Sequence, residues 1–389
     1  MINNSNTKIL FIGGHYNSAI ATIDWLLENT FLKNKNIVWA GHKFWDKKST
    51  IKDFLNLPNA NAKKHSEYIA ISEREIEFNA ILAGKIFRFK SLKYLPSFIL
   101  NLILIPIGFV NAIIILIKVK PSLIVSFGGF SAVPLVIIGK LLRIKSITHE
   151  QTVVVGLANK VIEKFVEKVY TAWPVEYYSS KNISKYEFVG LPMNPYLLDK
   201  KLEYSNFNFS NNKKTILFTG GKAGAVLFNK FLLSNILELS ETFNVIATIG
   251  RDTESLQKLK EIVETKKINN VKLYEYLFQK QMAEALKASD MVITRAGAHT
   301  IYELCYLNKK SLIIPLQYTS MGEQNRNASI ASKNIPCIVI NKDEPSDLDI
   351  MNGILDLDKL VLNLTFDSKI NFVDNASEQL SNHILKLLD

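Results

Sequence analysis

The stretch Thr294–Glu303, TRAGAHTIYE, brings a glycine turn, an arginine and a carboxylate close together after a short apolar run. The run predicts a buried strand, Gly297 lies in the following turn, and Ala298–Tyr306 has the pattern of a helix. Ligands of open α/β sheets bind at the carboxyl ends of strands, and free N–H groups at a helix start attract phosphate. Glu303 shares a helix face with Thr300, where a carboxylate could accept hydrogen bonds from a ribose diol. An ordinary strand, turn and helix has the same spacing, so this stretch alone does not establish a site.

Strands alternate with helices along the whole chain, which predicts an α/β fold with parallel sheets. The pattern restarts at Thr215, after a segment, 190–195, in which two prolines break regular structure. We therefore expect two Rossmann-like domains facing a central cleft, residues 1–193 and residues 194–389. The expected strands are 8–12, 37–40, 68–71, 123–126, 146–149, 169–172, 187–189, 215–219, 244–248, 271–274, 291–294, 311–315 and 337–340.

Both halves open with a strand that runs into a pair of glycines. In the first half the pair is followed by His15, and Ser18 is the expected N-cap of a helix from Ala19. In the second half Gly220 and Gly221 open a helix. The full G-x-G-x-x-G spacing of a dinucleotide-binding turn is absent from both.

Composition restricts the class of protein. Hydrophobic residues make up 48% of the 389 residues and charged residues 21%, which is typical of a globular chain. The excess of 47 Lys and Arg over 36 Asp and Glu favours nucleic acid, an anionic membrane or anionic substrates. Nucleic acid is disfavoured because the lysines are scattered and no recognition module is present. Two cysteines form neither a disulfide framework nor a metal cluster, and the N-terminus has no signal-peptide pattern, so we expect a cytoplasmic start.

The segment Phe98–Ile117 carries no charge and is long enough to span a bilayer. Asn101, Pro106, Gly108 and Asn111 interrupt it, and the α/β pattern resumes directly after it. We therefore expect a helix in the interface of an anionic membrane, with a buried core helix and a true span as the alternatives. The flanking lysines that suit anionic headgroups are Lys90, Lys93, Lys118 and Lys120.

Motifs along nearly the whole chain together resemble those of the MurG family of glycosyltransferases. They are GGH (13–15), AGK (83–85), FGGFSAVP (127–134), HEQ (149–151), GLANK (156–160), GLP (190–192), GGKAGA (220–225), TRAGAHTIYE (294–303) and PLQYTSMGEQNRNA (315–328).

The resemblance implies the GT-B fold and an inverting transfer of N-acetylglucosamine from UDP-N-acetylglucosamine. The implied acceptor is undecaprenyl-diphospho-muramoyl-pentapeptide (lipid I), which becomes lipid II in peptidoglycan synthesis. It also implies a peripheral protein on the cytoplasmic face of the cell membrane, with no tightly bound cofactor.

The family pattern also implies roles for individual residues. The acceptor side comprises Gly14, His15, His149, Glu150 and Gln151. The donor diphosphate is bordered by Gly221, Lys222, Gly224, Arg295, Ala296 and Gly297, the ribose by Glu303 and the sugar by Gln324. We expect the catalytic base to come from the N-terminal half, because the donor occupies the other half. The candidates are His15 and Glu150, with His149 as a third, and we prefer His15 because histidine accepts a proton near neutral pH.

Departures from the family pattern leave other functions open. Thr152 stands where the family usually has Asn, and Asn194 stands where it usually has an arginine near the donor. Lys222 replaces a serine and could supply part of the missing charge. The alternatives are a transferase for another lipid-linked acceptor, a non-catalytic GT-B-like membrane subunit, and a UDP-sugar epimerase, which would not need the apolar segment.

Overall fold

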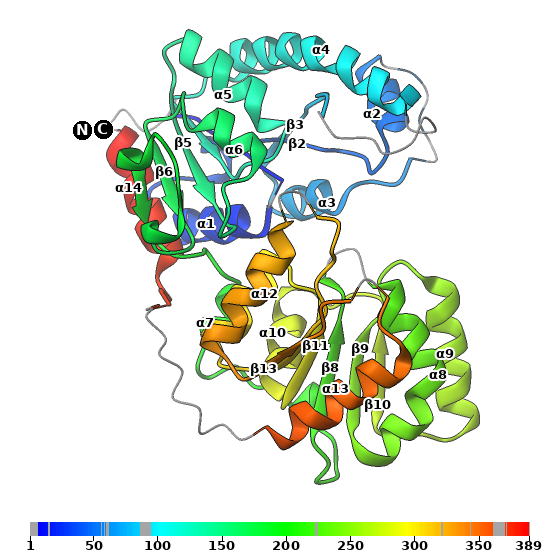
Figure 1. Ribbon diagram of the computed structural model, residues 1–389. Coiled ribbons are helices and arrows are strands. Elements are labelled where there is room, and N and C mark those ends of the chain that lie inside the picture. The colour runs from blue at the N-terminus through cyan, green and yellow to red at the C-terminus, as the bar shows by residue number, and fades with distance from the viewer. Residues whose placement is uncertain are drawn as a thin grey trace. The chain divides into compact units, whose positions relative to one another are not determined.

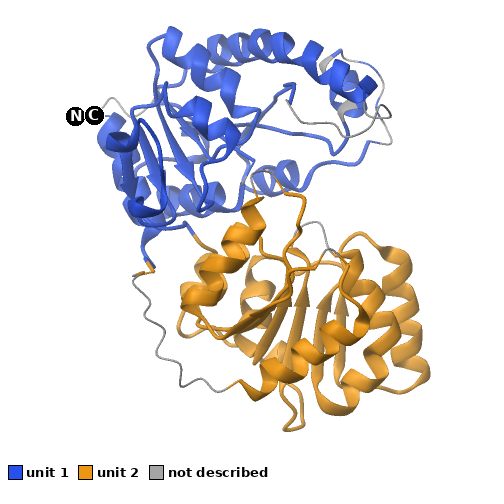
Figure 2. Cartoon of the chain, in the orientation of Figure 1, with its two compact units in different colours: residues 1–192, 373–389 blue, residues 193–372 orange. Residues whose placement is uncertain are grey.

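Each half of the chain folds around its own parallel sheet. The computed structural model describes residues 7–14, 16–55, 57, 59, 62–85, 95–221, 225–319, 322–342, 344–360, 370 and 372–388. Unit 1 comprises residues 1–192 and 373–389, and unit 2 comprises residues 193–372 (Figures 1 and 2). Both sheets have the strand order of a Rossmann fold, so the predicted α/β class with two Rossmann-like domains is confirmed.

The sheet of unit 1 has the order β3-β2-β1-β4-β5-β6-β7, and all its neighbouring strands are parallel. The chain adds strands on one side of β1 up to β3 and then on the other side from β4 to β7. The direction of winding therefore reverses between β1 and β4, which are neighbours. The strands are β1 (Ile9–Ile12), β2 (Ile37–Gly41), β3 (Glu77–Ala80), β4 (Leu123–Ser126), β5 (Lys145–Glu150), β6 (Lys168–Thr171) and β7 (Tyr186–Phe188).

Helices cover both faces of this sheet. Ile9 and Phe11 point toward a core shared with α1 and α14, and those two helices pack against each other (Figure 1). Ile124 points the other way, where α5 packs closely enough that a Cβ on Gly139 would lie 2.5 Å from its Cδ1 atom. The helices are α1 (Tyr16–Asn29), α2 (Lys47–Phe54), α3 (Ser66–Ser72), α4 (Leu95–Val119), α5 (Ala132–Leu141), α6 (Leu157–Ile162) and α14 (Ala376–Leu388).

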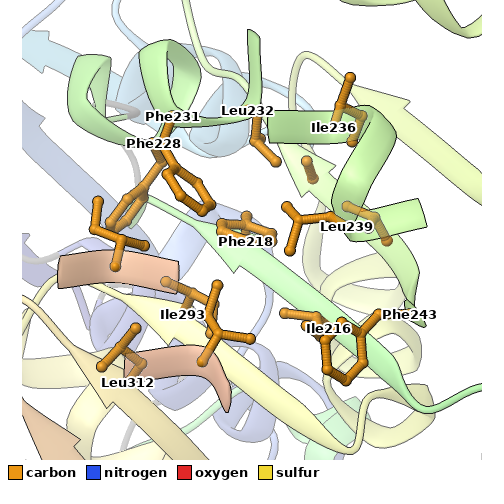
Figure 3. Packing of buried hydrophobic residues seen from close by; sticks show 14 of the residues in the cluster. Ile216, Phe218, Phe228, Phe231, Leu232, Ile236, Leu239, Phe243, Ile293 and Leu312 are labelled. Carbon is orange, nitrogen blue, oxygen red and sulfur yellow. The ribbon is translucent and has the colours of Figure 1, made fainter. Parts of the chain in front are cut away.

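Unit 2 repeats the design with the order β10-β9-β8-β11-β12-β13. Figure 3 shows Phe218 of β8 against Phe228 and Phe231 of α8, and all three side chains are buried. The strands are β8 (Thr215–Thr219), β9 (Asn244–Thr248), β10 (Val271–Tyr274), β11 (Met291–Thr294), β12 (Lys310–Ile313) and β13 (Cys337–Val339). The helices are α7 (Pro195–Leu198), α8 (Val226–Thr242), α9 (Thr253–Thr265), α10 (Gln279–Ala288), α11 (Ala298–Tyr306), α12 (Glu323–Asn334) and α13 (Asp347–Lys359).

Three sequence-based expectations differ from the structure. Residues 68–71 lie in helix α3 and not in a strand, and the strand of that region is β3. Ser18 lies inside α1 and donates to the carbonyl of Pro192 at 2.9 Å, so it is not the N-cap. Residues 373–389 belong to unit 1, whereas the sequence predicts that all of 194–389 form one domain.

Helix α4 turns its two asparagines inward together with part of its apolar residues, and its other apolar residues point outward. The Asn111 Oδ1 atom accepts a hydrogen bond from the Leu82 N–H at 3.0 Å, and Asn101 accepts one from Lys85 at 2.9 Å. Gly108 faces Ala83, to which a Cβ would come within 3.1 Å. The residues that interrupt the apolar segment therefore attach it to residues 82–85. Its exposed apolar side chains are Leu95, Ile99, Leu100, Leu102, Ile103, Val110, Ile113, Ile114 and Ile117.

Candidate functional site

The first glycine turn of unit 1 lies at the point where the winding of its sheet reverses. Gly14 follows β1, and its N–H donates to the carbonyl of Gly128, which follows β4, at 3.1 Å. A Cβ on Gly13 would lie 2.5 Å from the Cβ of Phe127, and one on Gly129 would lie 2.9 Å from the nitrogen of Gly14. Only glycine allows the two turns to approach this closely. Ligands of open α/β sheets bind at such a reversal.

The predicted acceptor residues at the end of β5 are buried. His149 is 1% exposed, and its Nε2 atom lies 2.9 Å from the carbonyl of Gly190. Gln151 is also 1% exposed, and its carbonyl accepts a hydrogen bond from the indole of Trp173 at 3.2 Å. Gly14, in contrast, is exposed at the same sheet edge. The side chains of His149 and Gln151 are therefore buried below the sheet edge, whereas Gly14 is exposed at it.

The carboxylate of Glu150 accepts hydrogen bonds from the loop that follows it and from α6. Its Oε1 atom accepts from the N–H and the hydroxyl of Thr152, at 3.0 and 2.8 Å. Its Oε2 atom accepts from the N–H of Gly156 and the side-chain amide of Asn159, both at 2.9 Å. The side chain is 3% exposed. These partners could not be predicted from the motif, because they depend on the path of the loop.

In unit 2 the two predicted diphosphate turns follow neighbouring strands. Gly221 comes after β8 and Arg295 after β11, and these strands pair in parallel at the reversal of the second sheet. Gly221 is exposed with φ of +69°, and a Cβ there would meet nothing within 4 Å. Gly297, the N-cap of α11, has φ of −67°, so glycine is not needed there for a left-handed conformation. It keeps the helix start open, since a Cβ would meet only the Thr300 hydroxyl, at 3.8 Å.

Arg295 is fixed in place by its neighbours. Its guanidinium donates to the carbonyl of Ile314 at 3.0 Å and lies 5.3 Å from the ring centre of Phe228. Burial lowers the pKa of this group. The side chain of Ala296 is fully buried, so only its backbone could contact a ligand.

Asn327 is a residue of this turn that the sequence reasoning missed. It is fully buried on α12, and its side-chain amide donates to the carbonyl of Ala296 at 3.0 Å. Gln324, one turn earlier on α12, is partly buried and accepts a hydrogen bond from the Leu316 N–H at 2.9 Å. The spacing of three residues between Gln324 and Asn327 could have indicated that both face the turn.

Glu303 lies on α11, partly buried, and burial raises the pKa of its carboxyl group to about 8. No hydrogen bond or positive charge from the described residues lowers that pKa. A ligand with hydroxyl donors would supply what this carboxylate lacks.

Three predicted site residues, His15, Lys222 and Gly224, lie outside the described residues. Asn194, at the position of the missing arginine, donates to the carbonyl of Gln279 at 2.6 Å and caps α7. Within the described ranges, no group of three His, Cys, Asp or Glu side chains is placed to hold a metal ion.

Each half of the chain matches a domain of the same protein family. Residues 61–171 match the glycosyltransferase family 28 N-terminal domain, and residues 215–382 match the glycosyltransferase family 28 C-terminal domain. The chain belongs to glycosyltransferase family 28. The family matches include both glycine turns that follow β4 and β8 and the turn that follows β11.

Two curated relatives of this chain have the same name. The UDP-N-acetylglucosamine–N-acetylmuramyl-(pentapeptide) pyrophosphoryl-undecaprenol N-acetylglucosamine transferase of Streptococcus agalactiae is 33% identical over 330 residues, covering 83% of this chain and 81% of the relative. The protein of the same name from Clostridium perfringens is 32% identical over 305 residues, covering 77% and 81%.

Solved structures agree on the fold. The MurG of Acinetobacter baumannii has a TM-score of 0.62 at 18% identity, covering 98% of this chain and 99% of that one. The UDP-GlcNAc 2-epimerase of Neisseria meningitidis has a TM-score of 0.58 at 14% identity, covering 98% and 100%. This likeness shows that the family 28 chain has the GT-B fold, which the transferase and the epimerase share.

Proposed function

We propose that this protein is an inverting glycosyltransferase that moves N-acetylglucosamine from UDP-N-acetylglucosamine to undecaprenyl-diphospho-muramoyl-pentapeptide. The observation that carries the proposal is the 33% identity, over 83% of the chain, to a relative named for that transfer. The product would be lipid II of peptidoglycan synthesis.

Unit 2 is the proposed donor domain. Gly221 is exposed, and no side chain caps the start of α11, so the N–H groups at this helix start suit a diphosphate. Glu303 would accept hydrogen bonds from the ribose, and Gln324 would contact the sugar hydroxyls. Arg295, Ala296 and Gly297 would border the diphosphate, together with Lys222 and Gly224 of the glycine turn.

Unit 1 is the proposed acceptor domain, and His15 is the proposed base. The attacking hydroxyl must lose its proton as UDP leaves from the other side of the sugar. His15 directly follows the exposed Gly14, whereas His149 is 1% exposed and bonded to Gly190. General-base catalysis typically contributes about 10²–10⁴-fold. His15→Ala should therefore lower kcat by roughly that factor and leave UDP affinity, measured by calorimetry, nearly unchanged. Near-full turnover in this variant would exclude His15.

The decisive assay uses labelled UDP-N-acetylglucosamine and lipid I, with a disaccharide lipid as the expected product. Acceptors that lack the peptide stem test the alternative of another lipid-linked acceptor, which the departure at Thr152 favours. A third reaction without acceptor tests for epimerisation of the donor. Absence of both reactions, with UDP still bound, would indicate a non-catalytic subunit.

The proposed location is the cytoplasmic face of the cell membrane, with α4 in the interface. By length and composition alone, α4 is the one described helix that could cross a membrane. Only 39% of its most apolar window is buried, which is less than expected of a core helix. A span would have to break the hydrogen bonds from Leu82 and Lys85 to the two asparagines of α4. An interfacial helix keeps them and places the outward apolar face in lipid. Of the four flanking lysines, Lys118 is bonded to Glu77 and Asn79, and Lys90 and Lys93 lie outside the described residues.

A further inference from the structure

The carboxylate of Glu150 is surrounded by hydrogen-bond donors. A carboxylate offers about four lone-pair sites, and four donor groups lie within hydrogen-bond distance of those of Glu150. The hydroxyl of Thr152 is also directed at the carbonyl of Val154, so its single proton is shared between these two acceptors. Thr152 supplies two of the donors, and Gly156 and Asn159 supply the others. An acceptor hydroxyl could reach an oxygen only by displacing a buried donor, which would then lose its partner.

The four donors come from the two ends of one loop. Thr152 lies at the start of residues 151–156, Gly156 lies at the end, and Asn159 lies in the first turn of α6. One carboxylate thus ties the end of β5, the loop and α6 together. The opposite side of the loop is held by Tyr178, whose hydroxyl donates to the carbonyl of Thr152 at 3.0 Å, and by the indole of Trp173.

The same network reaches the glycine turn after β4. The Oδ1 atom of Asn159 accepts a hydrogen bond from the hydroxyl of Thr148 at 3.1 Å. A Cβ on Gly128 would lie 3.0 Å from the Nδ2 atom of Asn159, so the turn rests against this amide. Gly128 in turn accepts the hydrogen bond from Gly14. Asn159 therefore connects Glu150 to the exposed edge of unit 1.

We infer that Glu150 is a positioning residue, which shapes loop 151–156 and the turn at Gly128 to receive the acceptor, and that the acceptor proton goes to another group. The inference rests on the proposed function, because the acceptor is that of the proposed transfer.

Hydrogen exchange of the intact protein tests the loop directly. Mass spectrometry would follow the peptide that contains residues 151–157 in the wild type and in Glu150→Gln and Thr152→Val. Exchange should rise roughly 3- to 10-fold in Thr152→Val, which loses the hydroxyl that contacts Glu150 and Val154, and further in Glu150→Gln. Glu163→Gln is the matched control, because Glu163 is another buried carboxylate of unit 1, whose partners are Ser180, Asn182 and Tyr186. Exchange of the loop should not change in the control.

Kinetics test the role in the reaction. Glu150→Gln and Thr152→Val should both raise the KM for the acceptor, roughly 3- to 10-fold in Thr152→Val, with UDP affinity within about twofold of wild type. Thr152→Ser, which keeps the hydroxyl, should restore the wild-type KM. The pH profile of kcat should keep its shape in Glu150→Gln.

Two results would overturn the inference. One is unchanged exchange of residues 151–157 in both variants. The other is a loss of about 10²–10⁴-fold in kcat for Glu150→Gln, with a changed pH profile and an unaffected Thr152→Val, which would identify Glu150 as the base. If the wild-type protein transfers no sugar, the proposed function fails, and exchange still decides whether Glu150 holds the loop.

Discussion

At the scale of single residues, Glu303 differs from the other carboxylates because burial raises its pKa to about 8 while no described residue donates to it. A ribose diol would supply two donors. Losing hydrogen bonds to a charged group typically costs about 1.5–3 kcal/mol. Glu303→Ala should therefore weaken UDP binding by roughly 10- to 100-fold in calorimetry. Unchanged UDP affinity in this variant would rule out the ribose assignment.

The raised pKa of Glu303 also predicts that UDP binding releases a proton near pH 7. The free carboxyl group is mostly protonated there, and a carboxylate that accepts two hydroxyl donors must be ionised. UDP affinity should rise from pH 7 to about 8 and then level off, in a range where the nucleotide phosphate is already ionised. Calorimetry in buffers of different ionisation enthalpy measures the released proton, and Glu303→Gln should abolish it.

The sign of the effect on folding follows from the same shift. The pKa of Glu303 is about 8 in the folded protein and near 4.5 in the unfolded chain, so the folded state holds the proton more tightly. This contribution to stability is fully present below pH 4.5 and is lost as the pH rises through 8. The stability of Glu303→Gln should therefore fall less than that of the wild type between pH 5 and 9. A parallel fall would mean that the carboxylate is solvated.

The candidate site could be predicted from sequence only where backbone N–H groups, and not side chains, form it. Glycines such as Gly221 and the start of α11 follow apolar strands, so their position at the sheet edge could be predicted. The burial of His149 and the four donors to Glu150 could not, because they depend on how loop 151–156 returns to the sheet. Asn327 was missed for the same reason, since its partner Ala296 lies on another element.

At the scale of elements, the central strands were predictable and one edge strand was not. Strands such as β8 (TILFT) and β9 (NVIAT) are buried along their whole length, and each has three consecutive apolar residues at its centre. Strand β3 lies at the sheet edge and has the polar sequence EFNA, which gives no such run. The apolar sequence YIAI at residues 68–71 instead belongs to α3, whose start is capped by the side chain of His65.

The outward face of α4 predicts reversible binding to anionic vesicles. Ile103, Ile114 and Ile117 are 54%, 52% and 59% exposed, so replacing all three by serine removes little packing. The triple variant should stop sedimenting with vesicles and should melt within a few degrees of wild type. The wild type should be released by mild detergent.

Leu104 of the same helix provides the control, because it is only 2% exposed. Leu104→Ser should lower the melting temperature, since it places a hydroxyl in the core. If the triple variant melts as low as this control and the wild type does not sediment with vesicles, α4 is a core helix. Resistance of the wild type to carbonate extraction would indicate a true span.

At the scale of the whole molecule, α14 belongs to the core of unit 1 although unit 2 precedes it in the chain. Leu380 is fully buried there, and Leu380→Ala should cost about 2–5 kcal/mol of unfolding free energy. Denaturation with and without UDP should show the loss in the transition that UDP does not shift. Asn382→Ala, an exposed change on the same helix, should alter stability by less than about 0.5 kcal/mol. An equal loss in both variants would contradict this packing.

The return of the chain to unit 1 has a consequence for synthesis on the ribosome. Residues 193–372 emerge before α14, so unit 2 can fold while the core of unit 1 still lacks one helix. During that interval the apolar side chains of α1 that later contact α14 are left without their cover. A nascent chain can therefore complete unit 2, the proposed donor half, before unit 1 receives its last helix.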